Sequence, residues 1–334
     1  MCKTDADCVA HVDAPICVDD RCVASDSGSQ AGSGGSGGGG ATSSGGSDAG
    51  TVAALDGGGT GGGSAGGTGS ASRTLSVDFV APLGLPMSKC QTFSNPFGRA
   101  VGIGEMRAHS TQWLARLWVY RVPGAVDGAV GNCATTPGTE LTNLIYFGQA
   151  LDDDVALPSG VAMALAAGYG LQIAIDYGNQ GAVDDEPAHV DFTVTPVDGG
   201  FEPAALGLLT DVSLLTPQTL GPTGVDVTCV LDTSVQVAAA TGHVLSHGQA
   251  FVAAAGATTL FASEPWDRKT AVAKGHSPAL SLASGSSVAL HCEYFVNGNL
   301  LHFGGDYWGV KDEQCSLFLY HYPPVSAPLL GSCN

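Results

Sequence analysis

Basic residues are scarce in this sequence, which has 12 Lys and Arg against 31 Asp and Glu in 334 residues and a formal net charge of -19. A chain this acidic is repelled by nucleic-acid phosphates and by anionic membrane surfaces, because charges of one sign oppose close approach. We therefore expect no nucleic-acid partner and no binding to lipid headgroups.

Long apolar segments are also missing. A membrane-spanning helix needs roughly 18 consecutive apolar residues, and the nearest stretch, VAMALAAGYGLQIAI at 161–175, is shorter and interrupted by glycines. The first residues, MCK, are not followed by the apolar core of a signal peptide. We therefore expect membrane attachment only through a lipid on Cys2, which would leave one of the next three cysteines unpaired.

No C-x-x-C pair occurs among the ten cysteines, which disfavours zinc ribbons and thioredoxin-like redox chemistry. An even number of cysteines predicts disulfides formed in an oxidising compartment. We expect an extracytoplasmic protein, secreted or held at the cell surface, whose signal peptide has been removed.

Composition divides the chain into zones. Residues 1–24 hold four cysteines and are too few to bury a core, which predicts a small disulfide-rich module. Residues 25–72 consist almost entirely of Gly, Ser, Ala and Thr, as in a flexible linker. About 260 residues follow, which is long for one sandwich, and the turn-rich stretch 195–205 marks a boundary. The predicted domains are therefore 73–198 and 199–334.

The globular part has the pattern of an all-β protein, with short alternating or apolar runs separated by Gly, Pro, Asn and Asp. This spacing predicts two β-sandwiches. Strands are predicted at TLSVDFV (74–80), LWVYRV (117–122), LQIAIDY (171–177), HVDFTVTPV (189–197), VDVTCVL (225–231), SVALHCEYFV (287–296) and SLFLYHY (316–322).

Three local features lead to further expectations. A strand is predicted across 241–249, with His243 and His247 on one face. Asn297–Gly298 is typical of a hairpin turn. The acidic run 152–154 is expected to be a solvated loop, with calcium binding as the alternative.

Several separated motifs carry a resemblance that spans nearly all of 75–334. They read CQTFSNPFG (90–98), ARLWVYRVPGA (115–125), LPSGVAMALAAGYGLQIAIDYGN (157–179), VTCVL (227–231), GHVLSHG (242–248), EPWD (264–267), LHCEYFVNGNLLHFGG (290–305) and DEQCSLFLYHYPP (312–324). In this order they resemble the copper type II, ascorbate-dependent monooxygenases, the family of the peptidylglycine α-hydroxylating and dopamine β-monooxygenases. The resemblance implies two jelly-roll β-sandwiches side by side. It also implies three disulfides, Cys90–Cys133, Cys229–Cys333 and Cys292–Cys315.

The resemblance also locates the family's first copper site, and its ligands are replaced in this chain. That copper is held by an adjacent His-His pair and by a His that precedes Tyr. The corresponding positions are Ala115 and Arg116 for the pair, and Asp176 before Tyr177.

One ligand of the second copper site is retained. That site takes a His-x-His pair and the Met of an EMC motif, which correspond to His243, Leu245 and Gln314. A substrate-contacting arginine of the family falls on Thr241, and one of its tyrosines falls near Phe318. By resemblance, His243 is thus the one retained ligand of six.

Coordination chemistry makes the loss consequential. A copper site needs two to four convergent imidazole or thioether donors. Leucine donates nothing, and Arg116 places a permanent positive charge where a cation would lie. We therefore expect no family-type copper site and no cofactor. A site rebuilt from His243 with His247, His109 or Asp176 is the alternative.

Three functions remain open at this stage. The first is a non-catalytic, exported relative of the family, tethered by its linker, that acts as a binding or structural module. Its ligand or protein partner would lie in the cleft between the sandwiches. The alternative is a copper-dependent monooxygenase or oxidase that uses non-standard ligands around His243. The third is a subunit whose missing ligands come from a partner chain.

Overall fold

The computed structural model describes residues 16–18, 21–23, 71–81, 86–112, 114–133, 141–178, 186–210, 221–245, 247–296, 314–325 and 331–333. The chain divides into two compact units, Met1–Ser64 and Ala65–Asn334. In the first unit, β1 (Ile16–Val18) and β2 (Arg21–Val23) form an antiparallel hairpin in which Cys17 lies opposite Cys22. The linker predicted at 25–72 lies outside the described residues, apart from its last two.

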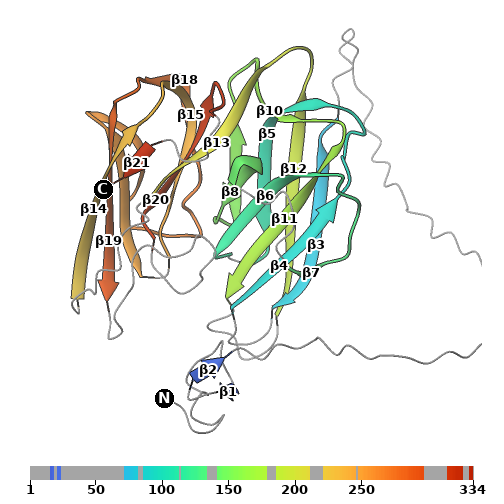
Figure 1. The fold of residues 1–334 in the computed structure, drawn as a ribbon, viewed down its shortest axis with the longest axis horizontal. Helices are drawn as coiled ribbons and strands as arrows, with labels where there is room; N and C mark the ends of the chain where they lie inside the picture. Colours follow the sequence, from blue (N-terminus) through green and yellow to red (C-terminus); the bar gives the residue numbers. More distant parts are fainter. Residues whose placement is uncertain are drawn as a thin grey trace, which may run out of the picture. The chain divides into compact units, whose positions relative to one another are not determined.

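The second unit is built of β-strands (Figure 1). All seven segments that the sequence predicts as strands, from 74–80 to 316–322, form strands. The first half contains β3 (Arg73–Ala81), β4 (Pro86–Phe93), β5 (Val101–Ser110), β6 (Arg116–Pro123), β7 (Gly131–Asn132), β8 (Leu144–Gly148), β9 (Asp152–Ala156), β10 (Val161–Leu165), β11 (Tyr169–Gly178) and β12 (Glu186–Val197). The second half contains β13 (Glu202–Thr210), β14 (Gly221–Leu231), β15 (Val235–His243), β16 (Gly248–Ala255), β17 (Thr258–Ser263), β18 (Lys274–Leu282), β19 (Ser287–Val296), β20 (Ser316–Tyr322) and β21 (Gly331–Cys333).

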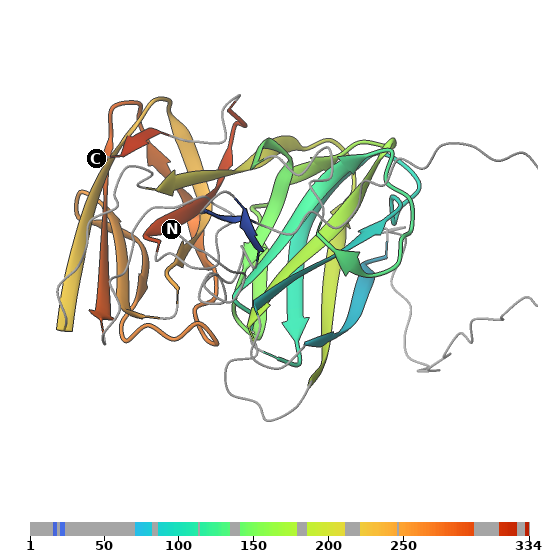
Figure 2. The ribbon, with the colours of Figure 1, turned by 60° about the horizontal axis from the view of Figure 1, so that its bottom comes forward.

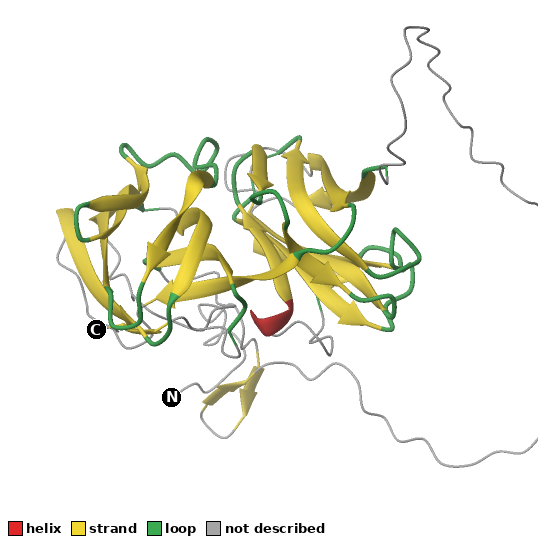
Figure 3. Cartoon of the chain, turned by 90° about the horizontal axis from the view of Figure 1, so that it is seen from above, coloured by secondary structure: helices red, strands yellow, loops and turns green. Residues whose placement is uncertain are grey.

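Helix is nearly absent from the described part of the chain. It contains one short 3-10 turn, η2 (Leu141–Asn143), drawn in red in Figure 3. Within the same residues, no helix has both the length and the apolar character needed to cross a membrane. The all-β class predicted from the alternating pattern is confirmed.

The strands form two jelly-roll β-sandwiches, each with its own apolar core (Figure 2). In the first, the sheet β7-β4-β11-β6-β8 packs against β10, β5, β12 and β3, with β9 beside β5. In the second, the sheet β17-β16-β19-β14-β21 packs against β18, β15 and β20. The sandwiches share one nine-stranded sheet, because β13 pairs parallel to β10 and antiparallel to β20.

The burial of each strand follows from what covers its two faces. β3 alternates between buried Leu75, Val77 and Phe79 and exposed residues, because only one of its faces contacts a core. β15 and β20 are buried at nearly every position. One face of β20 joins the second core, while Phe318 and Tyr320 join the core of the first sandwich. These two strands therefore lie between the two apolar cores, with side chains that pack into both.

The second unit contains three disulfides, Cys90–Cys133, Cys229–Cys333 and Cys292–Cys315. These are the three pairs that the family resemblance implies. The first holds β4 to the residue after β7, and the second holds the short terminal strand β21 to β14. By closing loops of 43, 104 and 23 residues, they stabilise the fold mainly by restricting the unfolded chain.

The expectation of one continuous strand across 241–249 is wrong. The strand predicted across 241–249 is interrupted, because β15 ends at His243 and β16 begins at Gly248 in the opposite sheet. The amide of Gly248 donates to the carbonyl of Leu245 at 3.3 Å, so the chain turns between the sheets, and His247 does not share a strand face with His243. The turn predicted at Asn297–Gly298 lies outside the described residues.

The acidic run 152–154 is not a solvated loop, because it forms most of β9. Strand alternation points Asp152 and Asp154 outward and buries Asp153. The Asp153 carboxylate accepts hydrogen bonds from the Tyr146 hydroxyl at 2.8 Å and from the Ala273 amide at 2.7 Å. The buried carboxylate thereby joins the first sandwich to the segment that precedes β18.

Candidate functional site

Arg116 and Asp176, which the resemblance relates to the family's first copper site, lie in one row across a sheet together with Ser88. β11 lies between β6 and β4, with Asp176 opposite Arg116 on one side and opposite Ser88 on the other. Arg116 Nε lies 2.9 Å from Asp176 Oδ2, and Trp118 Nε1 donates to the same oxygen at 3.2 Å. The Ser88 hydroxyl donates to Asp176 Oδ1. Arg116 and Asp176, two of the residues that stand where the resemblance expects ligands, therefore form an ion pair. The sequence did not predict this pairing.

Burial explains why the two charges occur together. Arg116 is fully buried, and Asp176 is 9% exposed. A buried charge is costly unless an opposite charge and hydrogen bonds replace its water. The Arg116 guanidinium also lies 5.7 Å from the centre of the Trp118 ring, within range of a cation–π contact. Ala115 is buried beside this pair and supplies no ligand atom.

His243 is held at the end of β15 by the first sandwich. Gln149 donates from Nε2 to the Gly242 carbonyl at 2.8 Å, so its Oε1 faces His243 Nδ1, 2.9 Å away. An amide oxygen can only accept, so the proton of His243 lies on Nδ1. Among the described residues, Nε2 has no hydrogen-bond partner. Its lone pair is therefore buried and unused.

The charge state of His243 follows from the same surroundings. Its side chain is 1% exposed, and burial lowers its pKa well below the ordinary value, with further lowering by the charges of Arg116 and Arg268. His243 is consequently neutral in the folded protein. The two halves of the candidate site lie near each other, because the Phe147 ring contacts both the His243 ring and the Trp118 ring.

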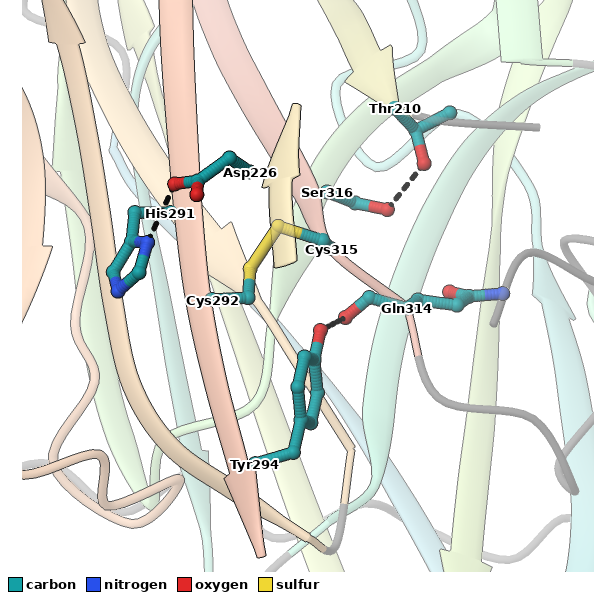
Figure 4. Close-up of a disulfide and its surroundings, with 8 residues drawn as sticks. All are labelled: Thr210, Asp226, His291, Cys292, Tyr294, Gln314, Cys315 and Ser316. Carbon is teal, nitrogen blue, oxygen red and sulfur yellow. Dashed lines mark hydrogen bonds and ion pairs between the residues drawn. A yellow bond between two sulfur atoms is a disulfide. The ribbon is translucent and has the colours of Figure 1, made fainter. Parts of the chain in front are cut away.

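The other positions of the second copper site supply no metal donors of the family type. Leu245 and Gln314 are buried, and the backbone carbonyl of Gln314 accepts the Tyr294 hydroxyl at 2.9 Å (Figure 4). Thr241 lies directly opposite Phe318 on the neighbouring strands β15 and β20. The two positions that the resemblance relates to substrate contacts thus form a cross-strand pair, one of them apolar.

Aromatic rings fill the space between the two halves. Phe147 of β8 stacks on Phe318 of β20 with ring centres 4.0 Å apart, and it meets the His243 ring edge-on at 5.1 Å. Trp118 contacts Phe147 edge-on at 4.7 Å. The expected cleft is therefore closed by packed side chains at these positions.

The two weaker histidine candidates lie elsewhere. His109 is on β5, and its Nδ1 lies 2.6 Å from Asp152 Oδ1 on the neighbouring strand, in an exposed pair. The backbone carbonyl of His247 accepts the Phe295 amide at 2.9 Å in the turn before β16.

The donors present do not fit a copper ion at either position. Arg116 supplies a fixed positive charge, and its ion pair occupies Asp176. At the second position, the Nε2 lone pair of His243 is one donor where at least two are needed. In the described residues, no group of three His, Cys, Asp or Glu side chains is placed to hold a metal ion. We therefore derive no chemistry through copper.

Sequence reasoning missed the residues that connect the two sandwiches. Gln149 positions His243, Phe147 packs between Trp118 and Phe318, and Asp153 bonds to the Ala273 amide. Gln149 and Phe147 lie in no metal or catalytic pattern, and Asp153 was noted only as part of the acidic run 152–154. The one available signal was the family order itself, because it brings 115–118 and 241–243 to the same interface.

Comparison with known proteins adds little to this site. No protein-family model matches the chain, and no curated protein matches it. Among solved structures, it is similar to the major capsid protein P2 of bacteriophage PM2, at 9% identity over 75% of this chain and 97% of that chain, with a TM-score of 0.26. It is also similar to the VP2 subviral particle of infectious bursal disease virus, at 12% identity over 79% and 78%, with a TM-score of 0.13. Likenesses this weak carry no argument about function.

Proposed function

We propose that this chain is a non-catalytic, extracytoplasmic binding or structural module, related to the copper type II monooxygenases but without either metal site. The observation that carries the proposal is the buried Arg116–Asp176 ion pair. The family's copper is held by neutral imidazoles, whereas this pair carries opposite charges that neutralise each other within one sheet of the first sandwich.

The packing at the interface supports a fixed scaffold. A ligand between the sandwiches would have to displace the stacked Phe147–Phe318 pair and the Gln149–His243 hydrogen bond. Exposed surfaces outside the interface are better placed to bind a partner. Three disulfides suit a protein exposed to an oxidising environment.

Copper uptake tests the proposal. Protein supplied with Cu(I) or Cu(II) and then desalted is expected to retain well under one equivalent, because five of the six family donors are absent and Arg116 repels a cation. His243→Ala serves as the matched control, since it removes the one retained ligand. Two tightly bound ions per chain in the wild type would overturn the proposal.

A second candidate function, a copper-dependent oxidase or monooxygenase built around His243, is favoured by one observation. A metal-binding histidine commonly donates its second ring N–H to an oxygen, and His243 does so to Gln149 while Nε2 stays unpaired. One equivalent of copper in the wild type, lost in His243→Ala, would favour this candidate. Leu245→His with Gln314→Met is expected to raise uptake toward one equivalent. No change on that substitution would show that positions 245 and 314 are wrongly assigned.

A further inference from the structure

The outer face of the second sandwich contains a depression of about 330 Å³ that none of the family motifs explains. It lies over three neighbouring strands, β14, β19 and β16. The side chains that matter here are Phe295 and Glu293 on β19, Gln249 on β16 and Pro222 on β14. A volume of this size is at the lower end of what small-ligand sites provide.

Two local irregularities create the depression. Gly224 is the cross-strand partner of Glu293, so no side chain stands beside the carboxylate on that side. On the other side, the register between β16 and β19 shifts between Gly248 and Ala250, which leaves Gln249 as an extra, outward-facing residue. Bulges of this kind redirect a side chain at the edge of a site.

The position of Glu293 is fixed by its neighbours on the same outer face. Its Oε1 lies 3.3 Å from His291 Nε2, and His291 Nδ1 lies 2.7 Å from Asp226 Oδ1. Figure 4 shows His291 and Asp226 on the side of β19 away from the Cys292–Cys315 disulfide. The side chain of Glu293 is nevertheless 56% exposed. The Glu293 carboxylate is thus oriented by His291 and is still accessible to solvent.

An aromatic surface and a second acceptor complete the depression. Phe295 is 48% exposed, which is unusual for a ring of its size. Its backbone N–H donates a hydrogen bond to the His247 carbonyl, and this bond holds the end of β19 in place. Gln249 donates from Nε2 to the Gly248 carbonyl at 3.2 Å, which leaves Oε1 as an acceptor. The two long polar side chains therefore offer hydrogen-bond acceptors beside an apolar ring.

We propose that this depression binds an alkylammonium group, whose N–H bonds go to Glu293 and Gln249 while its methylene stem lies on Phe295. An anion would be repelled by Glu293 and by the chain's net charge of -19. A sugar hydroxyl is neutral and would leave the charge of Glu293 without a counter-charge. A guanidinium prefers both oxygens of a carboxylate, and one oxygen of Glu293 already contacts His291. An ammonium needs only one carboxylate oxygen, and it is also attracted to the face of the Phe295 ring.

The inference deepens the proposed function, because it gives the binding module a ligand and a place. The two stand on different residues, however. Copper uptake tests the interface between the sandwiches, and amine binding tests the outer face of one of them. Failure of either experiment therefore leaves the other interpretable.

The test is an NMR titration of the full chain with two amines. 1,5-Diaminopentane represents a free polyamine, and an acetylated, amidated Gly-Lys-Gly peptide represents a protein side chain. Both are expected to shift resonances of β14, β16 and β19. Glu293→Gln and Phe295→Leu should each weaken binding about two- to fivefold. Tighter binding of one probe identifies the source of the ammonium group.

Two matched controls decide whether the depression itself is responsible. Glu202→Gln makes the same charge change at the start of β13, beside β10 and outside the depression, and should leave binding unaltered. Gly224→Thr fills the depression, since an added Cβ would meet only His291 Cε1, at 3.3 Å, a half-exposed ring that can shift. It should abolish binding. Equal binding of the uncharged 1,5-pentanediol, or an equal loss in Glu202→Gln, would overturn the proposal.

Discussion

At the scale of single residues, the ion pair at Arg116 invites a direct test. Arg116→Met leaves the Asp176 carboxylate buried without its counter-charge and is expected to cost about 3–5 kcal/mol of unfolding free energy. The double variant Arg116→Met, Asp176→Asn should recover most of that loss, because the asparagine carries no charge, its Oδ1 can accept from Trp118 and its Nδ2 can donate to the Ser88 hydroxyl. Denaturant unfolding of the wild type, both single variants and the double variant measures the coupling. Strictly additive losses would show that the pair does not act as a unit.

The sequence identified Arg116 and Asp176 only through the positions that they occupy in the family motifs. Their pairing depends on the register of β6 against β11, which places residue 116 opposite residue 176 across 60 positions of chain. A one-residue slip would move either side chain to the other face of the sheet. No local pattern encodes that register, so the sequence indicated two lost ligands and the structure shows one ion pair.

His321 provides a pH prediction at the same scale. It is fully buried on β20, its Nδ1 lies 3.1 Å from the Pro323 carbonyl, and burial lowers its pKa to about 4. His321 therefore becomes protonated below about pH 6.5 in the unfolded chain, but only below about pH 4 in the folded protein. Unfolding free energy is lost over that window, by about 3 kcal/mol at its acid end.

His321→Asn isolates this contribution, since the amide keeps a donor for Pro323 and does not titrate. The stability of the variant relative to the wild type is expected to rise steadily between pH 6.5 and 4. The unfolding free energy of the variant must be compared with that of the wild type at each pH, because the protonation of Asp153 changes the unfolding free energy in the opposite direction. Burial raises its pKa to about 6, so its protonation strengthens the fold as the pH falls from 6. A pH-independent difference between variant and wild type would contradict the assignment to His321.

At the scale of elements, strands were easier to predict than their ends. Alternation and apolar runs located strands such as β3 and β19, because each buries at least one face against a core. The stretch 241–249 misled the same reasoning, since its apolar residues continue on both sides of a turn. Gly248 closes that turn, where an added Cβ would collide with the Val244 side chain. The position therefore requires a residue without a side chain, a constraint that the hydrophobic pattern does not reveal.

At the scale of the whole second unit, composition suggested two domains joined at a turn. The turn exists between β12 and β13, but β13 then completes a sheet with strands from both sides. Side chains of β20 extend this connection into the first core. Sheet continuity depends on pairings between distant strands, which a boundary read from Gly and Pro content does not reveal.

The shared sheet predicts that the two sandwiches unfold together. Variants that keep either Trp118 or Trp266 report the first and second sandwich separately by fluorescence, and their denaturation midpoints are expected to coincide. Phe318→Ala removes the ring that stacks on Phe147 across the interface and should cost about 3–5 kcal/mol. Because β13 and β20 belong to one sheet, that loss should lower the midpoint at both tryptophans equally. Phe79→Ala, which truncates an aromatic of the first core far from β20, serves as the control for a local cavity. If the Trp118 and Trp266 transitions separate in the wild type, the sandwiches are independent folding units that merely touch.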